Sequence, residues 1–194
     1  MLPFFFNISA LLCKSMKITN IFVVLLIISS CGGGSSNVTE NDSSIPGNDL
    51  NPVNETCVDT SRNGVDKCDL THDNRNRFYY LYVPDNLDTN QSIPILFAFH
   101  GYGSSALRHL GYTNYIPIAD RNNFIVVYPQ GESTSTLSAH WNVGGWTSKS
   151  PVKDLEFVET VIDLLKDKLP IDETRIYSSG MSNGGYMGYH LACN

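Results

Sequence analysis

The chain has 194 residues, of which 42% are hydrophobic and 16% charged, and its formal net charge is −6. This acidic balance offers no basic stripe of the kind that binds nucleic acid. No group of cysteines and histidines has the spacing of a zinc site, so the sequence predicts neither a nucleic-acid partner nor a bound metal.

Residues 1–31 are predicted to be targeting sequence. An apolar run at 18–28 follows two lysines, and it has the length and charge of a secretory signal rather than of a membrane span. The run closes on Ile28-Ser-Ser-Cys31, which resembles a bacterial lipobox, a cleavage site whose cysteine becomes lipidated. We therefore expect an exported protein that is lipid-anchored at the bacterial cell envelope through Cys31, or secreted. An uncleaved membrane anchor is the alternative, and Met16 is an alternative start.

Residues 32–76 are predicted to be a flexible tether. Gly, Ser, Asn, Asp and Thr dominate from residue 32 to about residue 64, without a hydrophobic period. Cys57 and Cys68 lie at the end of this segment, where a disulfide between them would close a small loop in an exported protein. The pairing of Cys193 stays open.

The folded part is expected at residues 77–194, where strand-forming and helix-forming segments follow one another. Aromatic and β-branched residues predict strands at 78–83, 95–99, 124–128 and 176–179. Short helical pieces are expected at 112–122. A longer helix is predicted at 153–169, where apolar residues recur at three- and four-residue steps. This order predicts an α/β fold, with a mostly parallel sheet and flanking helices.

The stretch Gly180-Met-Ser182-Asn-Gly184 carries the main functional signal. It follows a predicted strand and precedes a helix-compatible segment, which is typical of a nucleophile elbow, a tight turn that exposes a serine hydroxyl above the sheet. The two glycines relieve crowding at such a turn because they have no Cβ. Ser182 is therefore the candidate nucleophile; the alternative is a Gly/Ser loop without chemistry.

A serine hydroxyl needs a base, and usually a carboxylate that orients the base. In α/β-hydrolases both follow the serine along the chain. Here the histidine that follows Ser182 is His190, and eight residues along one helix place it ~12 Å away, beyond hydrogen-bonding reach. We expect the base and the acid beyond residue 194. The sequence thus reads as an α/β-hydrolase fold truncated after its nucleophile elbow, inactive alone, with 176–179 as an unpaired, aggregation-prone edge.

Two backbone N–H groups are expected to hold the oxyanion of the reaction. One belongs to Asn183, the residue after the nucleophile. The other belongs to Tyr102 in His100-Gly-Tyr-Gly103, the loop that follows an earlier apolar strand. An ordinary turn is the alternative for that loop.

At these motifs the sequence resembles the exported esterase family of polyhydroxybutyrate depolymerases, feruloyl esterases and acetylxylan esterases. The resemblance covers residues 77–194, the front half of the family's catalytic domain. Its pieces are Pro94-Ile-Leu-Phe-Ala-Phe-His-Gly-Tyr-Gly, Phe124-Ile-Val-Val-Tyr-Pro-Gln-Gly, Trp141-Asn142, Val152-Lys-Asp-Leu-Glu-Phe-Val and Ile171-Asp-Glu-Thr-Arg-Ile-Tyr-Ser-Ser-Gly-Met-Ser-Asn-Gly-Gly. Lys153 replaces the first acid of the family's Asp-Asp pair, and Gln130 an acidic or small polar residue; both are expected away from the nucleophile.

The resemblance implies an α/β-hydrolase fold and acyl transfer to water, with no metal and no organic cofactor. Ser182 would attack an ester carbonyl, the Asn183 and Tyr102 N–H groups would hold the oxyanion, and water would release the acid. Trp141 and Trp146 would form an aromatic wall for a sugar or phenolic ring, and packing beneath their long loop is the alternative.

The expected substrate is polymeric or polymer-derived. The two tryptophans favour feruloyl or acetyl esters of plant-wall polysaccharide over polyhydroxybutyrate. A serine peptidase of the prolyl-oligopeptidase type and a non-catalytic surface binding protein remain alternatives.

Overall fold

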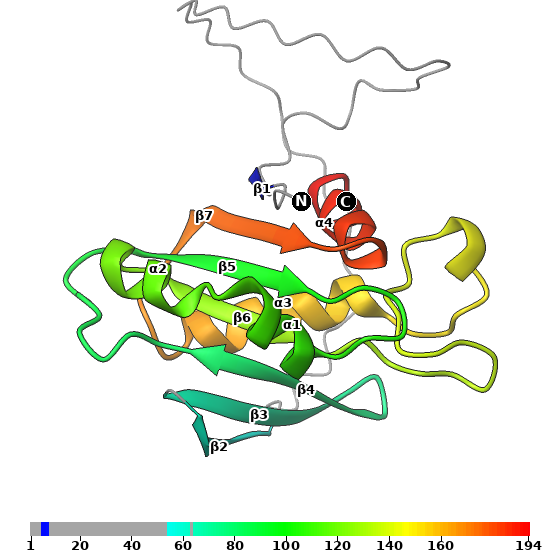
Figure 1. Cartoon of the computed structure of the whole chain (residues 1–194), viewed down its shortest axis with the longest axis horizontal. Coiled ribbons are helices and arrows are strands. Elements are labelled where there is room, and N and C mark those ends of the chain that lie inside the picture. Colours follow the sequence, from blue (N-terminus) through cyan, green and yellow to red (C-terminus); the bar gives the residue numbers. More distant parts are fainter. Residues whose placement is uncertain (1–4, 8–53, 63) are drawn as a thin grey trace, which may run out of the picture. The chain divides into compact units, whose positions relative to one another are not determined.

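The computed structural model describes residues 5–7, 54–62 and 64–194. The strands form one mixed sheet in the order β1-β7-β5-β6-β4-β3-β2 (Figure 1). Their bounds are Phe5–Asn7 (β1), Glu55–Arg62 (β2), Val65–His72 (β3), Arg75–Tyr82 (β4), Ile93–Phe99 (β5), Ile125–Pro129 (β6) and Ile171–Gly180 (β7). The three central strands β5, β6 and β7 are parallel, and the pairs outside them are antiparallel. The mostly parallel centre agrees with the α/β arrangement predicted from the sequence.

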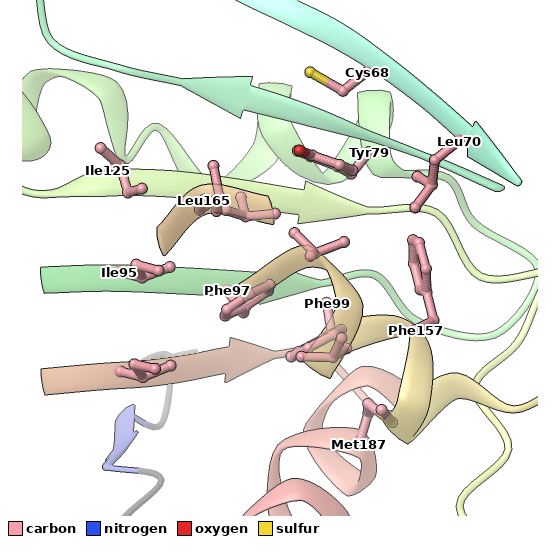
Figure 2. Packing of buried hydrophobic residues seen from close by; sticks show 14 of the residues in the cluster. Cys68, Leu70, Tyr79, Ile95, Phe97, Phe99, Ile125, Phe157, Leu165 and Met187 are labelled. Carbon is pink, nitrogen blue, oxygen red and sulfur yellow. The ribbon is translucent and has the colours of Figure 1, made fainter. Parts of the chain in front are cut away.

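Helices cover both faces of the sheet. Their bounds are Ala106–Thr113 (α1), Ile116–Asn122 (α2), Asp154–Lys166 (α3) and Asn183–Ala192 (α4), with a short 3-10 helix at Gly145–Thr147. Side chains of α1 and α2 pack in one hydrophobic cluster, and those of α3 and α4 pack in another. Figure 2 shows the second cluster, in which Phe157 and Leu165 of α3 and Met187 of α4 lie against Phe97 and Phe99 of the sheet.

The sequence of strand β5 is continuously apolar because both faces of the strand are covered. Ile95, Phe97 and Phe99 belong to the cluster beneath α3 and α4, whereas Leu96 and Ala98 belong to the cluster beneath α1 and α2. Because side chains alternate along a strand, a strand covered on both faces has no polar side. The carboxyl end of β5 lies next to the end of β7, where Phe99 pairs with Gly180.

The boundary predicted between tether and folded part is wrong. Strands β2 and β3 occupy residues 55–72, inside the predicted tether, and a disulfide joins Cys57 of β2 to Cys68 of β3. Strands β2 and β3 were not predicted from the sequence because most of their side chains are polar. Val65 packs on one face of the sheet and Cys68 and Leu70 on the other, which is too little apolar surface to stand out as a period.

Strand β1 lies within the predicted leader and pairs antiparallel with Tyr177–Ser179 of β7. The edge that we expected to be unpaired is therefore partly covered. Residues 8–53, with the apolar run and Cys31, lie outside the described residues. In the described part of the chain, no helix has the length and hydropathy needed to cross a membrane.

Candidate active site

Ser182 occupies the turn between β7 and α4. Its backbone angles are φ 53° and ψ −117°, and its side chain is exposed. A positive φ is uncommon for a residue with a Cβ, and such strain concentrates at functional sites. The first N–H groups of α4 have no acceptor within the helix and face the turn, as do those of any helix start. These features have the geometry expected of a nucleophile elbow.

The glycines around Ser182 are required by close backbone contacts. A Cβ on Gly180 would lie 2.3 Å from the carbonyl carbon and oxygen of Gly184, and a Cβ on Gly184 would lie 2.2 Å from the Phe99 carbonyl oxygen. Both distances are far below van der Waals contact. The helix can approach the ends of β5 and β7 this closely only because neither glycine has a side chain.

The loop after β5 reaches the candidate nucleophile. A Cβ built on Gly101 would lie 3.7 Å from the Cβ of Ser182, so the backbone just before Tyr102 runs alongside the serine. Gly103 follows with φ 68° and donates its N–H to the Ala139 carbonyl at 2.8 Å. The structure therefore brings together the two segments expected to supply oxyanion donors, the start of α4 at Asn183 and the loop at Tyr102.

His100 shapes this loop. It is completely buried, its Nδ1 lies 2.8 Å from the Gly101 carbonyl, and its Nε2 accepts the Gly131 N–H at 2.9 Å. Burial lowers the pKa of His100, so the ring is neutral with its proton on Nδ1. Gln130 also lies 3.1 Å from Nε2. Gln130 is therefore closer to the site than the sequence suggested, one contact removed from the loop beside Ser182.

Trp141 does not form a substrate wall, and this corrects the sequence expectation. It is completely buried, with its ring edge-on to Phe99 at 5.0 Å. Its indole N–H donates to the His100 carbonyl at 2.8 Å, and its backbone N–H donates to the Asn183 side-chain oxygen at 2.7 Å. Trp141 instead packs beneath the long loop, which was the alternative, and its hydrogen bonds to His100 and Asn183 stabilise this buried position.

Trp146 is 55% exposed, and its ring meets that of Tyr102 at 5.2 Å in an edge-to-face arrangement. Tyr102 is itself 45% exposed, and its hydroxyl accepts the Ser138 N–H at 3.2 Å. Sequence reasoning gave Tyr102 a role only through its backbone. The flanking glycines of the loop were the signal for an exposed aromatic, but nothing in the sequence pointed to its ring partner.

None of the five histidines is hydrogen-bonded to Ser182 in the part of the chain that the structure describes. His140 is buried between the Ser138 carbonyl and the Ser150 hydroxyl. His190, at the far end of α4, contacts Asn194. The base that Ser182 needs is therefore not assigned to any of them.

A buried ion pair supports the loop that carries Trp141. Arg77 of β4 donates to Asp154 of α3 at 2.8 Å, and both side chains are fully buried. The other oxygen of Asp154 accepts the Asn142 N–H at 2.7 Å. Sequence reasoning missed both residues. By contrast, the family departure Lys153 lies on the surface, between Asp73 and Glu156.

In the described part of the chain, a cavity and a cluster of metal-type ligand atoms both lie away from Ser182. A cavity of about 320 Å³ is lined by residues of β4 and of the segment 130–139, but not by Ser182, Tyr102 or Trp146. Among the described residues, Glu55, Cys57 and Cys68 bring metal-type ligand atoms together. The two sulfurs are joined in the disulfide, so they are not free thiolates for a metal.

Comparisons of the sequence with known proteins find esterases. The chain is 34% identical over 114 residues to a bifunctional acetylxylan esterase/xylanase of Neocallimastix patriciarum, which covers 59% of the chain and 15% of that protein. It is 35% identical over 115 residues to feruloyl esterase B of Thermothelomyces thermophilus, which covers 58% of the chain and 38% of the relative. The chain is homologous to part of these esterases. It spans well under half the length of either relative.

The fold is that of the α/β-hydrolases. An S-formylglutathione hydrolase from Agrobacterium tumefaciens superposes with a TM-score of 0.53 at 14% identity, over 71% of this chain and 55% of that one. No family model matches the sequence.

Proposed function

We propose that the protein is a serine-dependent carboxylic ester hydrolase that acts on feruloyl or acetyl esters of plant-wall polysaccharide. The strained and exposed backbone of Ser182, set between β7 and α4, is the observation that carries this proposal. Esterase relatives that bear the words feruloyl and acetylxylan in their names support the substrate class.

In the proposed reaction, Ser182 attacks the ester carbonyl and forms a tetrahedral intermediate. The backbone N–H groups of Asn183 and Tyr102 hold the developing oxyanion. Collapse of the intermediate releases the alcohol, and water then releases the acid from the acyl-enzyme. No metal or organic cofactor takes part in these steps. The exposed rings of Trp146 and Tyr102, which contact each other, are the proposed contacts for the acyl group or the sugar.

The nucleophile is tested in the full-length gene product by Ser182→Ala. We expect kcat to fall by at least about 10⁴-fold with KM nearly unchanged, because the substitution removes the attacking atom and leaves the binding surfaces in place. Ser148→Ala, an exposed serine on the neighbouring loop, serves as the matched control and should behave as wild type. Wild-type turnover by Ser182→Ala would remove the assignment.

The substrate class is tested by assaying methyl ferulate, p-nitrophenyl acetate, polyhydroxybutyrate and a peptide side by side. Cleavage of the first or second supports the proposal. Cleavage of the polyester alone would identify a depolymerase with the same nucleophile. Cleavage of the peptide alone would favour a peptidase, and the absence of any turnover would favour a binding protein.

Export and lipid anchoring at Cys31 form a second part of the proposal. The Cys57–Cys68 disulfide supports export, since disulfides persist in oxidising compartments outside the cytoplasm, and the lipobox-like Ile28-Ser-Ser-Cys31 is the basis for the anchor. A cell-surface or periplasmic position would bring the enzyme to polymeric esters or their fragments.

A further inference from the structure

We propose that the Asn183 side chain and Trp141 form a brace that holds the two oxyanion donors at a fixed separation. The inference rests on the proposed function, which it deepens by naming two positioning groups. The donors belong to separate elements: Asn183 begins α4, and Tyr102 lies in the loop after β5. Their spacing must be set by contacts between these elements, because a donor works only at the position where the oxyanion forms.

The first half of the brace is a reciprocal pair. The Asn183 side-chain oxygen accepts the Trp141 N–H at 2.7 Å, and the Asn183 side-chain amide donates to the Trp141 carbonyl at 3.1 Å. Asn183 is 1% exposed. Two hydrogen bonds in opposite directions fix both the position and the rotation of the amide plane, and with them the residue whose backbone N–H is the first donor.

The second half runs from the same tryptophan to the other donor. The Trp141 indole N–H donates to the His100 carbonyl at 2.8 Å. His100 lies two residues before Tyr102, and its ring nitrogens already hold the Gly101 carbonyl and the Gly131 N–H. One buried residue thus contacts the start of α4 through its backbone and the oxyanion loop through its side chain.

Packing alone does not explain this choice of residues. A buried amide costs free energy unless its donors and acceptor are satisfied, and an apolar residue of similar volume would fill the space without that demand. A further hydrogen bond fixes the backbone next to Trp141. The following residue, Asn142, donates its N–H to Asp154 of the buried ion pair. Loop movement is therefore restrained on both sides of Trp141.

The test removes the hydrogen bonds of the brace in the full-length gene product. Trp141→Phe deletes the indole N–H, and Asn183→Leu deletes the reciprocal pair. Each should lower kcat on p-nitrophenyl acetate by about 10- to 100-fold with KM within about twofold, since a displaced donor loses part of its stabilisation of the oxyanion. Affinity for a boronic acid that mimics the tetrahedral intermediate should fall by the same factor. The double variant should be far less impaired than the product of the two single effects.

Val161→Ala is the control for mere loss of stability. Val161 is completely buried in α3, and it belongs to the same hydrophobic cluster as Trp141. At equal loss of melting temperature it should keep wild-type kcat. If the two brace variants keep wild-type kcat and boronate affinity, the brace is overturned while the esterase function stands.

Amide hydrogen exchange separates the remaining outcomes. Exchange at residues 100–103 and 183–185 should quicken in both brace variants and not in Val161→Ala, if the brace holds these segments. A wild type that cleaves no ester would sink the proposed function and, with it, the catalytic role of the brace. Unchanged exchange together with lowered kcat would assign the loss to another cause and also overturn the brace.

Discussion

At the scale of single residues, the site depends on the lack of a side chain at its glycines as much as on the Ser182 hydroxyl. Ser182 adopts its strained angles while α4 approaches β5 to a distance that excludes a side chain at Gly184. The sequence predicted the elbow, because its glycines and serine are adjacent in the chain. It could not predict that Trp141 turns inward, because that depends on the His100 carbonyl and the Asn183 amide, which lie 41 and 42 residues away.

Gly184→Ala should damage the elbow. The new Cβ would lie 2.2 Å from the Phe99 oxygen and 2.6 Å from the His100 oxygen, so the helix must move. We expect a loss of about 1–3 kcal/mol in the free energy of unfolding, typical of overpacking. Gly185→Ala, in the same helix, is the control, because its Cβ would lie 3.5 Å from its nearest neighbour, the Gly180 carbonyl oxygen at the end of β7. The control should be neutral or slightly stabilising. Equal urea midpoints for the two variants would contradict the expectation.

His109 should make stability depend on pH. Burial, and then the nearby His100, lower the pKa of His109 from 6.5 to about 4. Its Nε2 is buried without a hydrogen-bond partner among the described residues. The unfolded chain binds a proton near pH 6.5 and the folded chain only near pH 4. The free energy of unfolding should therefore fall as pH drops through this window, by up to about 3 kcal/mol.

His109→Gln carries no titrating ring and should flatten this dependence. Burial also lowers the pKa of His72, His100 and His190, so the measurement is the difference between variant and wild type in urea unfolding at about pH 7.5 and about pH 5. Parallel changes in the two proteins would show that His109 contributes nothing.

At the scale of elements, the link between β4 and α3 supports the loop that carries Trp141. Arg77 and Asp154 are fully buried, and the guanidinium also stacks 3.9 Å from the centre of the Phe157 ring. The sequence predicted the strand and the helix within a few residues, the strand from its aromatic and β-branched residues and the helix from its apolar period. It did not predict the ion pair, because charged residues are usually exposed and only the folded structure shows that Arg77 and Asp154 are buried.

Removing one partner should cost more than removing both. Arg77→Met alone leaves the buried Asp154 carboxylate without its cation, and we expect a loss of about 3–5 kcal/mol. The double variant Arg77→Met, Asp154→Leu should recover a large part of this. The matched surface pair is Lys166–Glu173, at 3.1 Å and with both side chains in contact with solvent, where single and double changes should each have little effect because water screens the charges. Additive effects at the buried pair would refute this account.

At the scale of the whole molecule, the fold class followed from the sequence and the domain boundary did not. Apolar strands covered on both faces and one amphipathic helix were enough to predict a parallel α/β sheet. Strands β2 and β3 extend that sheet with mostly polar residues, and they are joined to each other by the Cys57–Cys68 disulfide. Such edge strands owe their structure to pairing and covalent linkage, neither of which leaves a period in the sequence.

The expected lipid anchor is a prediction about the same whole chain. Metabolic labelling with a fatty-acid analogue should mark the wild type and leave Cys31→Ser unmarked, because the lipid is attached to that thiol. Cys57→Ser is the control for a general effect of losing a cysteine, and it should keep the label. Equal labelling of wild type and Cys31→Ser would rule out the anchor at this residue.

The chain carries two tryptophans, and their contrasting environments give it built-in optical probes. Trp141 has no contact with solvent, whereas Trp146 is 55% exposed and its ring contacts that of Tyr102. Acrylamide should therefore quench the red-shifted emission of Trp146 first and leave a blue component from Trp141. A ligand that covers the Trp146 ring would protect the Trp146 emission from quenching. Loosening of the interior would shift the Trp141 emission to longer wavelength. One fluorescence titration therefore separates binding at the Trp146 surface from rearrangement of the buried loop around Trp141.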